Sequence, residues 1–77
     1  MLPIITVDFN NADGEGRLRL NIAGALADIK RMNLQLKNGL EVILNDNEGL
    51  ETTGIIQYSE DEKIWVAKID WDKIQNV

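Results

Sequence analysis

Carboxylates are the most numerous reactive side chains in this sequence, and they lack the partners that most enzymes use. The 77 residues include 13 Asp and Glu but no His and no Cys. Without His, the usual general base near neutral pH and the commonest metal ligand are missing. Without Cys, disulfides, thiolate metal sites and cysteine nucleophiles are excluded. The hydroxyl groups of Thr6, Thr52, Thr53 and Ser59 therefore have no imidazole to activate them, which excludes serine-type triads.

Two arrangements of carboxylates nevertheless invite a chemical interpretation. Asp70 and Asp72 would share one face of an extended strand, where they could act as acid and base. The chain is too short to enclose them in a deep pocket, so we expect no enzymatic activity. The three consecutive acidic residues 60–62 lie in one expected turn, where they could attract a cation. The two segments that could form a calcium-binding loop, beginning at Asp8 and at Asp46, do not match its residue pattern. We therefore expect a solvated loop, and neither a metal nor another cofactor.

The basic residues are few and dispersed. The formal net charge is −5, and no group of Lys or Arg exceeds two neighbours. This argues against nucleic-acid binding, which normally needs a basic stripe to displace phosphate counterions. The segment 14–16 resembles the start of a phosphate-binding loop, but it lacks the third glycine and a following helix. The remaining RNA-binding hypothesis rests on a small basic patch of Arg17, Arg19, Lys30 and Arg31.

Apolar residues occupy both faces of the expected C-terminal strands, although one face of a half-solvated sheet should be polar. The second apolar set consists of Ile43, Ile55, Ile64 and Val66. A helix that carries Leu26 and Ile29 is the ordinary cover for such a face. Any part left uncovered would mark a contact with a partner or with a second copy. On that interpretation, Val66→Lys should abolish the contact and leave the fold nearly intact.

The aromatic side chains gather in the last expected hairpin. Trp65 and Trp71 lie in its second strand and Tyr58 in its first. We expect Trp65 to fill the core, and Trp71, between two aspartates, to lie partly exposed. The candidate protein-interaction set is therefore Ile43, Ile55, Ile64, Val66 and Trp71.

Residue periodicity predicts the elements that position these side chains. Alternation with period two predicts strands, a helical spacing after Ile22 predicts one helix, and Asn21 and Asn33 are its expected caps. The first two strands are expected to form a hairpin. The order is β-β-α-β-β-β, over Pro3–Phe9, Arg17–Ile22, Ala23–Met32, Leu40–Leu44, Thr52–Tyr58 and Lys63–Trp71.

The last three expected strands resemble the meander of SH3-like barrels. The resemblance rests on Gly39 before a Val-rich strand, an acidic turn, Gly54 within a strand, and the segment 65–68. It implies a small antiparallel barrel that binds peptides, proteins or RNA. An open curled antiparallel sheet with the helix packed on one face is the alternative fold.

We expect residues 1–77 to form one domain without a membrane span or a signal peptide, in the cytoplasm. The leading functional hypothesis is a non-enzymatic SH3-like module or accessory subunit that binds another protein. The alternatives are RNA binding and a structural homodimer, because a chain this short gains stability from association.

Overall fold

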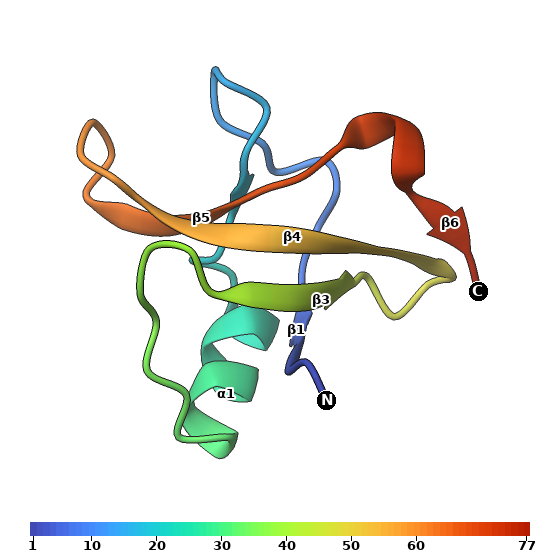
Figure 1. Cartoon of the computed structure of the whole chain (residues 1–77), viewed down its shortest axis with the longest axis horizontal. Helices are drawn as coiled ribbons and strands as arrows, with labels where there is room; N and C mark the ends of the chain where they lie inside the picture. Colours follow the sequence, from blue (N-terminus) through green and yellow to red (C-terminus); the bar gives the residue numbers. More distant parts are fainter.

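The computed structural model describes residues 1–77 as a curled sheet with one α-helix, mainly β as expected (Figure 1). Figure 1 shows β3 and β4 crossing the molecule, with α1 below β3. The elements are β1 (Ile4–Thr6), β2 (Leu18–Arg19), α1 (Ala23–Arg31), β3 (Glu41–Asn45), β4 (Leu50–Ser59), β5 (Ile64–Lys68), the 3₁₀ helix η1 (Trp71–Lys73) and β6 (Gln75–Asn76).

Strand β4 is the central strand of the sheet and pairs with three other strands. Its first half pairs antiparallel with β3, from Asn45 opposite Glu51 to Glu41 opposite Ile55. Its second half pairs antiparallel with β5, from Ile55 opposite Lys68 onward. The expected C-terminal hairpin is therefore confirmed, and β6 adds two further residue pairs at the start of β4.

Strands β1 and β2 do not form the expected hairpin. β1 pairs in parallel with β3, and β2 pairs antiparallel with β5. The reason is a turn after β1, in which the Asp8 carboxylate accepts a hydrogen bond from the N–H of Asn10 at 2.8 Å. Residues beyond this turn pair locally instead, with Ala12 opposite Leu18.

The sheet is open, with the strand order β1-β3-β4-β5-β2. β1 and β2 are its edges and do not pair with each other, so the barrel is not closed. The observed architecture is the alternative fold, a curled open sheet with the helix packed on one face, although β1 and β3 are parallel rather than antiparallel. No helix is long and apolar enough to cross a membrane.

The helix packs on the concave face of the sheet. Its fully buried Ala25 belongs to a single core cluster with Val42, Leu44, Ile56 and Ala67. Successive strand residues point to opposite faces, so Ile43 and Ile55 face away from this core. The expectation that α1 covers their face is wrong: the helix covers the opposite one.

Close backbone approaches hold the helix and strands in place. The Gly24 backbone of α1 lies against β1, where an added Cβ would be 3.0 Å from Thr6 Cγ2. The Asp28 carboxylate accepts hydrogen bonds from the Thr6 hydroxyl at 2.6 Å and from the Thr6 N–H at 2.8 Å. Because that N–H belongs to an edge strand, the helix also protects the edge from pairing with other chains.

The two ends of α1 differ in how well the sequence predicts them. Ile22, not Asn21, is the N-cap, and no side chain caps it, since the Asn21 amide oxygen accepts from Asn11 at 3.4 Å instead. At the other end the C-cap is Met32, and Asn33 directly after it reverses the chain with a left-handed φ of 51°. Glycine and asparagine are the residues that adopt this conformation at a helix end.

Candidate functional site

The depression with the most apolar lining lies between α1, the connector 33–40 and the start of β5. It has a volume of about 480 Å³ and is open to solvent. We call it the apolar groove, and seven of its nine lining residues are hydrophobic. The lining residues are Leu20, Asn21, Leu26, Ile29, Leu34, Leu36, Lys63, Ile64 and Trp65.

The end of the helix builds one part of this groove. The N–H of Leu34 donates to the carbonyl oxygen of Ile29 at 3.0 Å, and the N–H of Asn33 donates to that of Lys30 at 3.1 Å. Together with the left-handed Asn33 these bonds form a Schellman motif. The motif reverses the chain so that Leu34 and Ile29 line the same groove.

The connector is tied to β4, and this places Leu36 in the groove lining as well. The Asn38 amide oxygen accepts a hydrogen bond from the Tyr58 N–H at 2.8 Å, and the Gly39 N–H donates to the Ile56 carbonyl at 2.9 Å. Trp65 forms another part of the lining. Its ring packs edge-on against Tyr58, with 5.1 Å between ring centroids, and it also contacts the core cluster, as expected for this residue.

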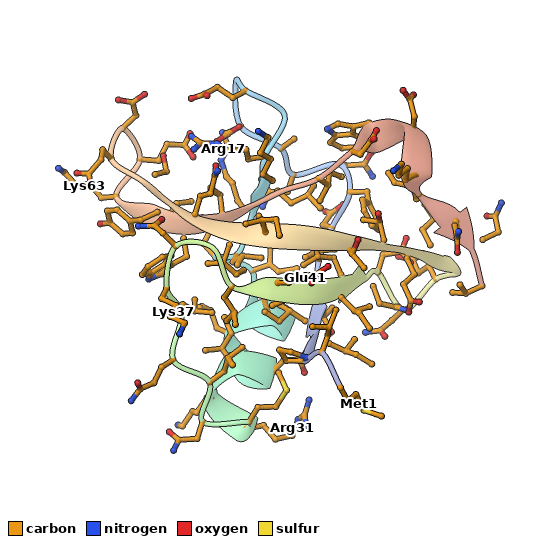
Figure 2. All side chains as sticks on the ribbon, in the orientation of Figure 1. Met1, Arg17, Arg31, Lys37, Glu41 and Lys63 are labelled. Atoms are coloured by element: carbon orange, nitrogen blue, oxygen red, sulfur yellow. The ribbon has the colours of Figure 1, made fainter.

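Exposed apolar surface and positive charge coincide at the groove. Leu26 is 54% exposed although it faces this depression. Lys63 is the sole charged residue in the lining. Figure 2 shows Lys63 on the β4–β5 turn and Lys37 on the connector, on the same side of the molecule. Lys30 lies one helical turn beyond Leu26, on the same helix face.

The structure does not gather the predicted interaction residues into one surface. Ile64 lines the apolar groove. Ile43 and Ile55 are diagonal neighbours on the convex face of the sheet, and Ile55 is 37% exposed. Trp71 is 44% exposed, as expected for this residue. Its indole N–H donates a hydrogen bond to the Gly16 carbonyl at 2.8 Å, so this side chain holds the loop before β2 in place.

Val66 must be removed from the candidate set because it is fully buried. Its cross-strand neighbours on the convex face are Arg19 and Gln57, and Arg17 bridges to the Gln57 side chain at 3.3 Å. The apolar stems of long polar side chains commonly cover a small aliphatic residue in this way. Val66→Lys would bury an ammonium group, so it would disrupt the fold and could not report on a contact.

The hypothesised basic patch is divided between two elements, and its arginines are engaged. Arg17 and Arg19 lie at β2, whereas Lys30 and Arg31 lie at the end of α1. Arg17 pairs with Asp13 at 3.0 Å, and Arg31 pairs with Asp28 at 3.1 Å. Arg19 makes two hydrogen bonds to Glu62, at 2.7 and 2.8 Å. These bonds raise the pKa of Arg19 and lower the pKa of Glu62. In Figure 2, Arg17 lies at the top of the molecule and Arg31 at the bottom.

Several carboxylates have structural roles in turns. Asp70 accepts a hydrogen bond from the Asp72 N–H at 3.0 Å and so caps η1, instead of facing Asp72 as an acid–base partner. Asp46 accepts from the N–H groups of Leu50 and Glu48, and these two bonds lower its pKa. No three acidic side chains converge in a way that could hold a metal ion.

Sequence reasoning missed most of the groove. The sequence predicts that Leu26 and Ile29 share one helix face, but it predicts that this face covers the sheet. Leu34 and Leu36 lie in an irregular segment, where periodicity says nothing about direction. The available signal was Asn33, because a left-handed turn after a helix brings the next apolar residue back to its last turn.

No protein-family model matches the sequence, and neither a curated protein nor a solved structure is similar to it.

Proposed function

We propose that this chain is a non-enzymatic protein-interaction module, related in its small β architecture to the SH3-like class, and that it binds its partner through the apolar groove. The observation that carries the proposal is the exposed apolar lining of the groove, with Leu26 54% exposed. In a small protein, such a concave apolar surface with few polar groups is the default binding site.

The chemistry of the chain supports binding over catalysis. It contains no His and no Cys, and all of its arginines are held by carboxylates. The groove contains no pair of titratable groups that could exchange a proton, since Lys63 is its one ionisable residue. Aliphatic and aromatic side chains around a concave surface are suited to receive apolar side chains of another protein.

A matched pair of variants tests the proposal. Leu26→Glu places a charge in the groove, and Ile55→Glu places the same charge on the convex face of the sheet. Both positions are exposed, at 54% and 37%, so both variants should fold. Tagged wild type and variants are incubated with nuclease-treated lysate of the source cells, and bound proteins are quantified by mass spectrometry.

We expect a stoichiometric partner with wild type and Ile55→Glu, and at least a tenfold loss with Leu26→Glu, because a carboxylate in an apolar contact loses its hydration. Equal recovery with Leu26→Glu would contradict binding through the groove. Loss with Ile55→Glu alone would move the contact to the convex face of the sheet. Light scattering of the purified protein shows whether that face joins two copies.

A further inference from the structure

The charges around the apolar groove differ from those of the molecule as a whole. The chain carries a net charge of −5, yet no carboxylate lines the groove. Lys63 lies in the lining, while Lys30 directly follows Ile29 and Lys37 directly follows Leu36. Glu62 directly precedes Lys63, but its carboxylate is paired with Arg19 at 2.7 Å. Glu60 and Asp61 do not line the groove. The groove therefore has an apolar surface with a basic border.

The three lysines at this border are free to bind another molecule. Every salt bridge in the structure uses an arginine, and none uses a lysine. Lys30, Lys37 and Lys63 are all exposed. The nearest helix carboxylate, Asp28, is already engaged by Thr6 and Arg31. Positive charge at the groove is thus not neutralised within the chain.

From this charge complementarity we infer, on the basis of the proposed function, that the occupant is an acidic amphipathic segment of a partner protein. Its apolar side chains enter the groove, and its carboxylates lie against Lys30, Lys37 and Lys63. This arrangement is a helix-in-groove or extended-peptide mode with a charged border. The charges select the partner and speed association, while the apolar contacts supply most of the affinity.

The open shape of the groove favours a polypeptide segment over a small apolar ligand. Pockets for small ligands usually bury about 70–90% of the surface of the ligand. Here Leu26 remains 54% exposed, and the depression is open to solvent. A polypeptide segment brings its own outer polar surface and needs no such enclosure.

The test uses a displayed library of random peptides, selected on the wild-type chain and counter-selected on Leu26→Glu. We expect the enriched peptides to carry apolar residues at regular spacing and an excess of Asp and Glu. A synthetic copy of one enriched peptide should bind about three- to tenfold more weakly to Lys63→Glu, and more weakly as salt increases. Lys63 has a positive φ, so Lys37→Glu repeats the test at a residue whose backbone conformation is ordinary. Lys68 is an exposed lysine outside the groove, and the Lys68→Glu variant should bind the peptide as wild type does.

The two indole groups provide an internal control for the site of binding. In a ¹H–¹⁵N spectrum, the peptide should shift the Trp65 indole signal and leave Trp71 unchanged, since Trp71 lies outside the groove. Enriched peptides without acidic residues, or unchanged binding to both Lys63→Glu and Lys37→Glu, would overturn the inferred occupant and leave the proposed function standing. A failure to enrich any peptide that depends on Leu26 would overturn both.

Discussion

At the scale of single residues, polar side chains hold the turns and the joins between elements. Asp28 connects α1 to the edge strand β1 through the hydroxyl and N–H of Thr6, and it also pairs with Arg31. Burial by itself raises the pKa of Asp28. The hydrogen bonds from Thr6 and the positive charge of Arg31 outweigh that effect, so the pKa is lowered from its ordinary value of 3.8.

This pKa shift predicts how stability depends on pH. A carboxyl group whose pKa is lower in the folded state stabilises the protein above its unfolded pKa, and this contribution is lost as pH falls through the folded pKa. Asp28→Asn should lower the free energy of unfolding by about 1–2 kcal/mol at pH 7, because it replaces charge-assisted hydrogen bonds. At pH 2 the difference from wild type should shrink.

Urea unfolding followed by tryptophan fluorescence at several pH values measures this difference. Asp61→Asn, at an exposed carboxylate with no hydrogen bond in the structure, is the control and should match wild type throughout. A difference between Asp28→Asn and wild type that persists undiminished at pH 2 would contradict the ionic role of Asp28.

At the scale of elements, the helix end and the connector decide where the groove forms. Asn33 has a left-handed φ of 51° and directs Leu34 back toward Ile29. The connector then reaches β4, where Asn38 accepts a hydrogen bond from the Tyr58 N–H. A regular helix continued past Asn33 would carry Leu34 away from this position, and the groove would lose part of its lining.

Two substitutions at one position test this role of the helix end. Asn33→Ala should destabilise the protein by about 1 kcal/mol, because alanine lacks the short polar side chain whose local hydrogen bonding lets asparagine adopt the left-handed conformation. Asn33→Gly should be as stable as wild type or more so, since glycine adopts this conformation freely. Thermal unfolding measures both variants, with Gln35→Ala in the exposed connector as control. Equal stability of the Ala and Gly variants would show that the backbone conformation at residue 33 contributes nothing.

The elements also show what the sequence can predict and what it cannot. Alternation predicts the pairing of β4 with β5 because their residues form one hairpin, where neighbours in sequence are neighbours in space. It extends the second strand too far, since β5 ends at Lys68 and Trp71 begins η1. The partner of β1 was not predictable in this way. The three residues of β1 pair with β3, although α1 separates the two strands in the sequence. The turn at Asp8 ends β1 and directs the chain away from a hairpin. Alternation places Val66 on the face opposite Trp65 and Ala67, but only the structure shows that Val66 is fully buried there.

At the scale of the whole molecule, the two faces of the curled sheet have different surroundings. The concave face holds the core and the helix, and the groove opens at the border of that helix. On the convex face, Val66 is buried between its cross-strand neighbours Arg19 and Gln57, and Ile55 is exposed. Lysines without carboxylate partners border the groove, while all the arginines pair with carboxylates. The groove thus combines exposed apolar surface with available charge.

Photo-crosslinking in the source cells tests the location of binding most directly. A photoreactive amino acid is placed at position 26 in the groove or at position 55 on the convex face, and the cross-linked products are identified by mass spectrometry. The proposed function predicts a discrete partner cross-linked from position 26 and none from position 55. A partner cross-linked from position 55 and not from position 26 would contradict it.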